Sequence, residues 1–369
     1  MIRSAPAGLY LHVPFCKTIC PYCDFHSITD TSHVHDWCDA VRFELARMRH
    51  RFPPFDTVFF GGGTPSAIDP ASLSSVLASL LDQKLTECTI ELNPDDVTIE
   101  QVSRYLEAGI NRLSLGVQSL NDRELRFLGR RHDAAQAMQA MDICRDAGGA
   151  NLSVDIMFGL PGQRLESCLA TLREVLSRAP EHISCYQLTI AEGTPLHDMI
   201  DGGSVHELPE DDQCAMFLGI SEYLRDHGYE HYEVSNYSLG DEYRCRHNLK
   251  YWRHQPYLGL GPAAHSFLGM DRWWNIADVQ EYCSRLKRGG DAVDTRETLT
   301  AEQLRLERLA LGFRTAEGVA LADLTGSGTW QTSLERMTAH GLLVPREDRL
   351  IPTVEGYLLA DRLALEFAC

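Results

Sequence analysis

Residues 9–23 read Leu-Tyr-Leu-His-Val-Pro-Phe-Cys-Lys-Thr-Ile-Cys-Pro-Tyr-Cys, which joins an apolar run to three closely spaced cysteines. Pro14 ends the apolar strand and begins a loop that carries Cys16, Cys20 and Cys23. Three thiolates suit a [4Fe-4S] cluster in which each binds one iron and the fourth iron stays open. An open iron is useful only if a small molecule occupies it, and the amino and carboxylate groups of a methionine moiety can do so. The stretch therefore predicts a metal centre at the end of a strand.

A zinc site of the Cys₃His type, with His26 as the fourth ligand, is the alternative interpretation of the same residues. The C-x₃-C-x₂-C spacing differs from the paired C-x₂-C knuckles of structural zinc, which favours the cluster. Phe15, Tyr22 and Phe25 would surround a cluster with an apolar collar. The other nine cysteines are scattered, which suits a protein of the reducing cytosol. We predict that they are ordinary small, buried or half-buried residues: Cys38, Cys88, Cys144, Cys168, Cys185, Cys214, Cys245, Cys283 and Cys369.

Short apolar runs and helical segments alternate from residue 8 to about residue 190. The predicted strands cover residues 9–13, 57–60, 89–92, 112–116, 152–157 and 182–188. The predicted helices between them cover residues 36–50, 71–81, 99–108, 134–147 and 165–178. Such alternation implies parallel strands joined by right-handed crossovers. Six units make a partial (β/α)₆ barrel, three quarters of a (β/α)₈ barrel, with an open doubly wound sheet as the competing architecture.

The rhythm ends after Glu192. We expect a helix over residues 211–226, a strand over 229–234 and an irregular stretch up to about residue 275. Helices over 304–311, 321–324, 334–340 and 354–367, with a hairpin of 342–345 and 349–352, resemble a mostly helical winged-helix module. Its acidity favours structural packing over DNA binding. The chain is thus predicted to divide into residues 1–195, 196–298 and 299–369.

The bulk composition is that of a globular protein of enzyme size. The 369 residues are 44% hydrophobic and 23% charged, with a net charge of −18. This charge argues against nucleic-acid binding, which usually needs a basic face. No stretch approaches the ~20 apolar residues of a membrane-spanning helix, and the first residues do not resemble a signal peptide. We therefore expect a cytoplasmic protein.

A glycine-rich segment, Gly61-Gly62-Gly63-Thr64-Pro65-Ser66, follows the second predicted strand. Glycines let the backbone approach a ligand closely and adopt unusual dihedrals. Together with the cysteine spacing, this segment resembles the radical-SAM superfamily, and within it the oxygen-independent coproporphyrinogen III oxidase group. The resemblance implies a radical-SAM barrel, a [4Fe-4S] cluster on Cys16, Cys20 and Cys23, and S-adenosylmethionine (SAM). The SAM contacts that it implies are Tyr10, Tyr22, Gly62, Gly63, Thr64, Glu91, Gln118, Arg130 and Asp155.

The sequence departs from the decarboxylating oxidases at Phe25, where their motif has a fourth cysteine. That difference argues against the oxidase reaction, so enzymatic activity stays open. Residues 247–252 read His-Asn-Leu-Lys-Tyr-Trp, and this HNxxYW stretch resembles the HemW family of haem chaperones in the same group. His247 offers an imidazole for haem iron, and Tyr251 and Trp252 offer flat apolar area. Basic residues that could attract haem propionates surround them at Arg244, Arg246, Lys250, Arg253 and His254.

Two functions remain open on these residues. The first is a haem chaperone that binds haem and transfers it to an acceptor haemoprotein, such as a respiratory, membrane-associated one, with a flavodoxin or ferredoxin as reductant. The second is a radical-SAM porphyrin-metabolising enzyme, oxidase-like or haem-degrading. The role of the motif is also open, because its residues could simply pack within the fold. If haem binds, Cys245 is a competing thiolate ligand of the iron. The sequence decides neither whether haem is attached covalently nor whether the protein forms a homodimer.

Overall fold

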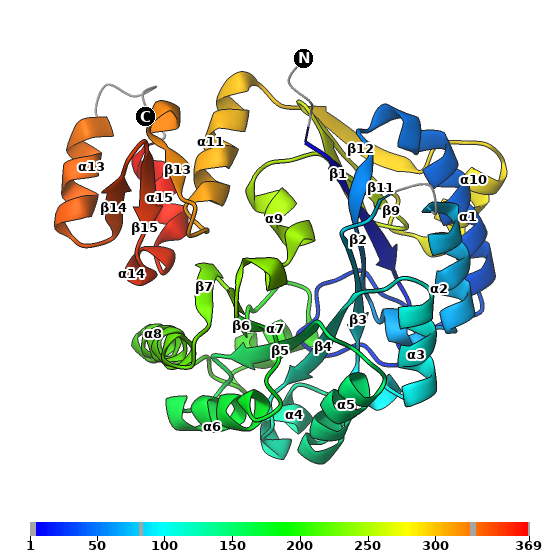
Figure 1. The fold of residues 1–369 in the computed structure, drawn as a ribbon, viewed down its shortest axis with the longest axis horizontal. Coiled ribbons are helices and arrows are strands. Elements are labelled where there is room, and N and C mark those ends of the chain that lie inside the picture. The colour runs from blue at the N-terminus through cyan, green and yellow to red at the C-terminus, as the bar shows by residue number, and fades with distance from the viewer. Residues whose placement is uncertain (1–4, 81–83, 325–329, 368–369) are drawn as a thin grey trace.

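A computed structural model of the chain describes residues 5–80, 84–324 and 330–367. These residues form a twelve-stranded sheet in the order β12-β11-β10-β9-β1-β2-β3-β4-β5-β6-β8-β7 and a separate three-stranded sheet. The large sheet curves into an arc, with helices along its outer side (Figure 1). Leu81, the last residue of a predicted helix, and Cys369 lie outside the described residues.

The centre of the large sheet confirms the predicted barrel units. Six adjacent parallel strands form it: β1 (Ala7–Val13), β2 (Phe55–Gly62), β3 (Glu87–Leu92), β4 (Arg112–Gln118), β5 (Leu152–Phe158) and β6 (His182–Gln187). The connecting helices are α1 (Val34–Met48), α2 (Pro70–Leu77), α3 (Ile99–Glu107), α4 (Asp122–Phe127), α5 (Ala134–Asp146) and α6 (Leu165–Leu176). Short 3₁₀ turns cover Arg49–Arg51, Pro65–Ala67, Ala78–Leu80, Pro94–Asp96 and Asp241–Tyr243. Helix α4 was not predicted.

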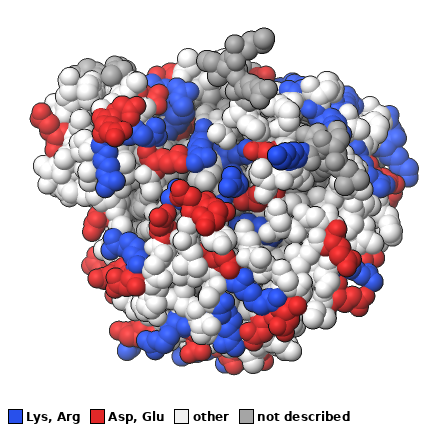
Figure 2. All heavy atoms as spheres, viewed as in Figure 1, with Lys and Arg blue, Asp and Glu red and all other residues white. Residues whose placement is uncertain are grey.

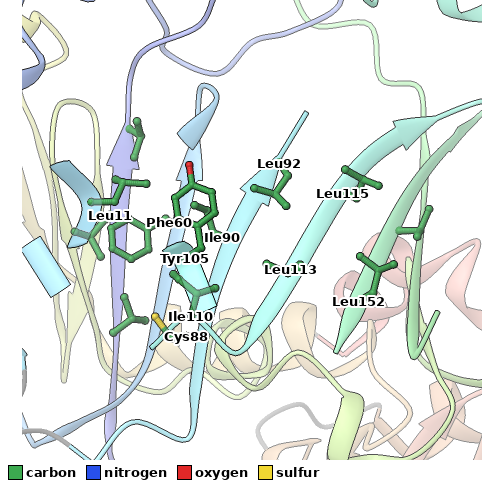
Figure 3. Close-up of a cluster of buried hydrophobic side chains, with 14 of the residues drawn as sticks. Leu11, Phe60, Cys88, Ile90, Leu92, Tyr105, Ile110, Leu113, Leu115 and Leu152 are labelled. Atoms are coloured by element: carbon green, nitrogen blue, oxygen red, sulfur yellow. The ribbon is translucent and has the colours of Figure 1, made fainter. Parts of the chain in front are cut away.

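Side-chain alternation along the strands separates the core from the inside of the arc. Leu9, Leu11 and Val13 of β1 are fully buried against the outer helices. Figure 3 shows this packing layer, in which Leu11, Phe60, Ile90, Leu92, Leu113, Leu115 and Leu152 from neighbouring strands meet helix residues such as Tyr105. The intervening residues Tyr10 and His12 point the other way and line a cavity.

The expectation of an irregular stretch up to about residue 275 is wrong. After α7 (Pro195–Asp201) and α8 (Glu210–Asp226), strands β7 (Glu230–Glu233) and β8 (Asn236–Ser238) extend the sheet beyond β6. Beyond β1 it continues through β9 (Tyr257–Leu260), β10 (His265–Leu268), β11 (Asp271–Asn275) and β12 (Val293–Thr298). Two helices, α9 (Arg246–Trp252) and α10 (Val279–Lys287), complete this part. The segment was misjudged because its strands are only three to six residues long and carry little apolar alternation.

The C-terminal part has its own small core and confirms the predicted helices and hairpin. It contains α11 (Ala301–Gly312), β13 (Val319–Ala320), α12 (Leu321–Leu324), α13 (Trp330–Ala339), β14 (Leu343–Arg346), β15 (Arg349–Pro352), α14 (Val354–Tyr357) and α15 (Ala360–Glu366). Leu309, Phe313, Leu350 and Phe367 are among the fully buried residues of this second core. Strands from both sides of residue 195 belong to the same large sheet. The division into residues 1–195, 196–298 and 299–369 stays a prediction.

Within the described residues, no helix combines the length and apolar character needed to cross a membrane. Acidic and basic side chains are interspersed over the face shown in Figure 2. That face shows basic and acidic side chains next to one another.

Candidate functional site

A cavity of about 910 Å³ lies inside the arc of the sheet. Side chains from the inner faces of β1 to β6 line its walls, together with residues of the cysteine loop, α9 and β10. All three cysteines of the predicted cluster line it, as do Tyr10, Tyr22, Gly62, Gly63, Thr64, Glu91, Gln118, Arg130, Asp155, His247 and Tyr251. Trp252 is half-buried, and it does not line the cavity as far as the structure describes it.

The cysteine loop is held at its base by backbone pairing. Phe15 and Ile28 form a parallel bridge, with the Cys16 amide 2.9 Å from the Ile28 carbonyl and the Ile28 amide 2.7 Å from that of Pro14. Cys16 is buried, whereas Cys20 and Cys23 are half-buried and open to the cavity. The loop thus presents three thiols from one short, anchored segment.

The surroundings of the thiols favour metal binding over reaction as free thiolates. Burial raises the pKa of Cys16 and raises that of Cys23 to about 11, so without a cation these thiols stay protonated. A metal centre would supply the missing positive charge and displace the protons. The donor set fits a [4Fe-4S] cluster, because three soft thiolates each bind a different iron. Among the described residues, no group of three His, Cys, Asp or Glu side chains already lies close enough together to hold a metal ion.

The glycine-rich segment runs beside the cysteine loop because β1 and β2 are parallel and adjacent. The Gly63 amide donates to the Val13 carbonyl at 2.8 Å, and the Thr64 hydroxyl lies 3.2 Å from the Cys16 sulfur. A Cβ atom at Gly63 would lie 2.8 Å from the Val13 carbonyl oxygen and 3.1 Å from the Cys16 sulfur. Gly62 has φ of 106°, in the region that favours glycine. Both positions therefore exclude larger residues.

Two carboxyl groups face the cavity from the ends of β3 and β5. Burial, followed by the charge of Asp155, raises the pKa of Glu91 to about 8. Burial also raises the pKa of Asp155, which accepts a hydrogen bond from the Ser114 hydroxyl at 3.2 Å. The Gly62 amide donates to Glu91 at 3.3 Å. Near pH 7 Glu91 therefore holds its proton and can both donate and accept hydrogen bonds.

Gln118 and Arg130 lie between these carboxyls and the cysteines. Gln118 has φ of 65°, unusual for a residue other than glycine, and its side-chain oxygen is buried with no partner among the described residues. Such an orphaned acceptor fits a ligand that brings a donor. Arg130 donates to the Gly116 carbonyl at 2.9 Å and to the Asn93 side chain, and its guanidinium lies 3.8 Å from the Cys20 sulfur.

The two predicted SAM tyrosines line the cavity from β1 (Tyr10) and from the cysteine loop (Tyr22). The Tyr10 hydroxyl is 3.3 Å from His12 Nδ1, and the Tyr10 ring stacks on Phe59 with centroids 6.3 Å apart. Tyr22 packs against a small apolar cluster that includes Leu128 and Leu160. Burial raises the pKa of both hydroxyls, so neither ionises near neutral pH.

The HNxxYW residues form the short helix α9, which lies inside the arc (Figure 1). His247 is 1% exposed, with Nδ1 3.0 Å from the Thr57 hydroxyl and Nε2 2.8 Å from the Tyr251 hydroxyl. Burial, followed by Lys250, lowers its pKa to about 3. Both ring nitrogens are therefore engaged within the fold, and the imidazole is neutral.

Helix α9 lies at the end of the barrel opposite the cysteines. The Glu87 carboxylate, at the start of β3, accepts from the amides of Arg246 and His247 at 2.8 Å each. Thr57 lies near the start of β2, and a Cβ at Gly8, near the start of β1, would lie 3.1 Å from the His247 ring. The cysteines follow the end of β1, so the motif and the cysteine loop bound the cavity from its two ends.

The predicted basic patch around the motif is largely neutralised. Carboxylates pair with four of its five members: Lys250 with Asp56 at 2.7 Å, His254 with Glu307 at 3.0 Å, Arg244 with Glu230 at 2.8 Å, and Arg253 with Glu317. Cys245 is fully buried beside Glu87. This region therefore offers haem propionates less positive charge than the sequence predicted.

Several cavity residues were missed from the sequence. His12 could have been found, since it shares the inner face of β1 with Tyr10. Arg112, His182, Asn236 and His265 also line the cavity. Asn236 and His265 come from the segment that was expected to be irregular, so no strand pattern placed them.

The chain is similar to known proteins in both sequence and fold. A family model described as the Radical SAM superfamily matches residues 10–175. A Bacillus subtilis protein named heme chaperone HemW is 31% identical over 96% of this chain and 97% of its own length. A mouse protein named radical S-adenosyl methionine domain-containing protein 1, mitochondrial, is 32% identical over 98% of this chain and 87% of its own. The solved structure of Escherichia coli coproporphyrinogen III oxidase (HemN) aligns with a TM-score of 0.81 and 20% identity, over 99% of this chain and 90% of that one.

Proposed function

Since the chain belongs to the HemW family of radical SAM proteins, we propose that it binds haem and transfers it to an acceptor haemoprotein. The observation that carries this proposal is the near full-length similarity to proteins named heme chaperone HemW, at 31–34% identity over 96% of this chain. The cavity of about 910 Å³ supports it, because a flat macrocycle needs a wide, largely apolar site.

We propose that the radical SAM core is retained for SAM binding. Cys16, Cys20 and Cys23 would hold the cluster, whose chemistry when reduced is one-electron cleavage of SAM. Among the proposed SAM contacts, the Arg130 guanidinium is suited to the carboxylate. Glu91 and Asp155 are suited to the ribose hydroxyls or the ammonium. The backbone at Gly62 and Gly63, with Tyr10, Tyr22, Thr64 and Gln118, would complete the site.

Haem contacts at His247, Tyr251 and Trp252 stay a prediction. Haem ligation by His247 would require its Nε2 to exchange the Tyr251 hydroxyl for iron, since that nitrogen is 2.8 Å from the hydroxyl. An acceptor such as a respiratory, membrane-associated haemoprotein, a flavodoxin or ferredoxin reductant, and a homodimer also belong to the proposal. Cytoplasmic location is a prediction of the same kind.

The test is haem transfer by the anaerobically reconstituted protein. Haem-loaded protein is mixed with an apo-haemoprotein, with and without SAM, and the spectrum of the acceptor is followed. We expect the acceptor to fill faster than with an equal amount of free haem and carrier albumin. A Cys16→Ala, Cys20→Ala, Cys23→Ala variant shows whether transfer needs the cluster. Failure of the loaded protein to fill the acceptor under any of these conditions would overturn the proposal.

A second candidate is a porphyrin-metabolising radical SAM enzyme. The observation that favours it is that the proposed SAM contacts and the cysteines line one cavity large enough for a porphyrin. Phe25, which stands in place of a fourth cysteine, is 63% exposed at the cavity and weakens the case for an oxidase. Conversion of coproporphyrinogen to protoporphyrinogen, or loss of the haem Soret band with SAM and reductant, would favour this second function.

A further inference from the structure

A buried arginine without a partner lies at the cavity floor, the end of the cavity at which β3 and β4 begin. Arg112 is the first residue of β4, lines the cavity and is 2% exposed. Within the described residues its guanidinium takes part in no hydrogen bond and no ion pair, and its Nε is buried. Arginine is almost never fully buried unless it is paired. An unpartnered guanidinium that faces a cavity therefore points to a ligand held in that cavity.

The two carboxylates whose charges act on Arg112 are already engaged by other donors. Glu87 accepts from two backbone amides at the start of α9, at 2.8 Å each, and Asp155 accepts from the Ser114 hydroxyl at 3.2 Å. Burial lowers the pKa of Arg112, but nearby acidic groups, Glu87 and Asp155 among them, raise it above its usual value, so the guanidinium is charged. These acids compensate its charge from a distance and leave its N–H groups without an acceptor.

A second unpartnered group lies beside Arg112. Thr89 of β3 is opposite Arg112 in the register of the two parallel strands and is fully buried. It comes two residues before Glu91, which lines the cavity, so strand alternation places both side chains on the inner face. The Thr89 hydroxyl has no hydrogen-bond partner in the described part of the chain. The floor thus offers a guanidinium and a hydroxyl that can both donate to one acceptor.

The floor is separate from the proposed SAM contacts. Gly116, whose carbonyl accepts from Arg130, lies four residues beyond Arg112 on β4, which corresponds to about 13 Å of strand. The cavity of about 910 Å³ extends over both positions. A group bound to Arg112 therefore leaves the other end of the cavity free for SAM.

We propose that the cavity floor is a binding site for a carboxylate, held by Arg112 and Thr89. A guanidinium matches a carboxylate in shape and can donate two parallel hydrogen bonds to it. The carboxylate belongs either to a small organic acid or to the acid end of a longer molecule that extends toward the SAM contacts. This inference goes beyond the proposed function and involves neither the haem iron nor its ligands.

Acetate is the probe, and its neutral analogue acetamide is the matched control ligand. Saturation-transfer difference NMR of the anaerobically reconstituted protein measures the binding of each at constant ionic strength, with and without SAM. SAM is included because it would occupy Arg130, the other cavity arginine proposed to bind a carboxylate. We expect a saturable acetate signal that persists with SAM, and no acetamide signal. An absent acetate signal, an equal signal from acetamide, or an acetate signal abolished by SAM would overturn the inference.

Variants assign the acetate signal to the floor. Arg112→Met removes the guanidinium and should weaken acetate binding about tenfold or more, whereas Arg112→Lys keeps the charge and should weaken it less. Arg104→Met is the matched control, because Arg104 forms an exposed pair with Glu100 on α3, and it should match the wild type. Iron content and urea unfolding check the fold of each variant. Unchanged acetate affinity in Arg112→Met would contradict the proposal.

Thr89→Val keeps the test open if Arg112→Met does not fold. It removes only a hydroxyl and should also weaken acetate binding. Unchanged affinity in both Thr89→Val and Arg112→Lys would overturn the inference.

Chain length separates the two sources of the carboxylate. Hexanoate should bind more tightly than acetate if the floor holds the acid end of a longer molecule, because its chain would bury apolar surface along the cavity wall. Equal affinities would identify a small acid as the ligand. Absence of acetate binding overturns this inference alone, and failure of haem transfer overturns the proposed function alone.

Discussion

At the scale of single residues, Asp96 links the cysteine loop to the rest of the site. Its side chain is 1% exposed and accepts from Lys17 at 2.5 Å, from Arg131 at 3.2 Å and from the Ser66 hydroxyl at 3.1 Å. Lys17 follows Cys16, and Ser66 ends the glycine-rich segment. One buried carboxylate thus joins the two segments that carry the proposed cluster and SAM contacts.

We expect Asp96→Asn to loosen this connection. Asp96 is buried but Lys17 is 49% exposed, so loss of the carboxylate charge should cost about 2 kcal/mol, and this cost falls on the cysteine loop. The variant should therefore lose iron faster to a chelator after reconstitution, measured as the decay of the brown chromophore. Glu100→Gln is the control, since Glu100 and Arg104 form an exposed pair on α3. Equal iron loss in Asp96→Asn and the wild type would refute this role for Asp96.

The cysteines and glycines could be predicted from the sequence because their roles depend on local spacing. Asp96 could not, because it is 79 positions from Lys17 and becomes relevant only when two loops meet. His247 shows a different limit. Its residue type suits a metal ligand, yet the fold engages both ring nitrogens, and such saturation by distant hydroxyls leaves no trace in the sequence.

At the scale of elements, the parallel strands could be predicted because apolar residues recur at alternate positions along their buried outer face and the strands alternate with helices. Helix α9 has seven residues and its polar members carry its contacts, so it lacks the periodicity of a longer amphipathic helix. Strands β9 to β12 were missed for a similar reason. Only β9 pairs with β1, which is far away in sequence, while β10 to β12 follow as short antiparallel strands paired with their neighbours along the chain.

A buried carboxylate on α1 ties this added part of the sheet to the barrel. Glu44 accepts from the Tyr282 hydroxyl at 2.6 Å, from Asn275 at 2.8 Å and from the Gly261 amide at 3.3 Å. It therefore connects α1 with α10, β11 and the turn after β9. Burial raises the pKa of Glu44 to about 7.

The stability of the protein should therefore depend on pH through Glu44. Between the ordinary pKa near 4.5 and the folded value of about 7, the unfolded chain releases a proton that the folded chain keeps. Stability contributed by this group thus falls as pH rises through that window, by ~3 kcal/mol in all. Glu44→Gln has no such proton. The stability advantage of the wild type over Glu44→Gln should shrink by about this amount between about pH 5 and pH 8.

Anaerobic urea unfolding at both pH values measures this difference, with Glu100→Gln as the exposed control. The comparison between variants cancels the effects of other buried carboxyls, such as Glu233, whose pKa is also raised, to about 8. A constant advantage of the wild type over Glu44→Gln across the range would show that Glu44 is ionised in the folded protein.

At the scale of the whole molecule, the curved sheet brings together residues from nearly the full length of the chain. The cysteine loop follows β1, Asp155 comes from β5, and His265 comes from β10. The partial barrel could be predicted from the regular alternation of strands and helices, and the resemblance to the radical-SAM superfamily identified its type. The closure of one cavity end by α9 and the extension of the sheet on both edges required the structure, because both depend on contacts between distant segments.

The C-terminal part has its own core, yet one of its side chains belongs to the main core. Tyr357 of α14 is 6% exposed and packs with the large cluster that includes Phe217 and Tyr237. Its ring lies 4.9 Å from that of His231, between centroids. Tyr357 therefore contributes a buried aromatic contact between the C-terminal part and β7, beside the partly buried Val354 and Leu358, which pack against the same cluster.

Tyr357→Ala should therefore destabilise the whole chain without touching the cluster. Truncation of a buried aromatic ring costs about 3 kcal/mol, from lost burial and the cavity left behind. Leu365→Ala on α15 is the matched control, because Leu365 is 71% exposed and its truncation should change stability by less than about 0.5 kcal/mol. Anaerobic urea unfolding gives the two free energies, and iron analysis checks that each variant still holds its cluster. Hydrogen exchange should rise in β7, β8 and α14 of Tyr357→Ala, where the contact is lost. Unchanged stability and unchanged exchange in that variant would mean that other contacts hold the C-terminal part. These include the pairs of Glu307 on α11 with His254 and Arg272, the pair of Glu317 with Arg253, and the backbone hydrogen bonds that join residues 232 and 234 to residues 316 and 314.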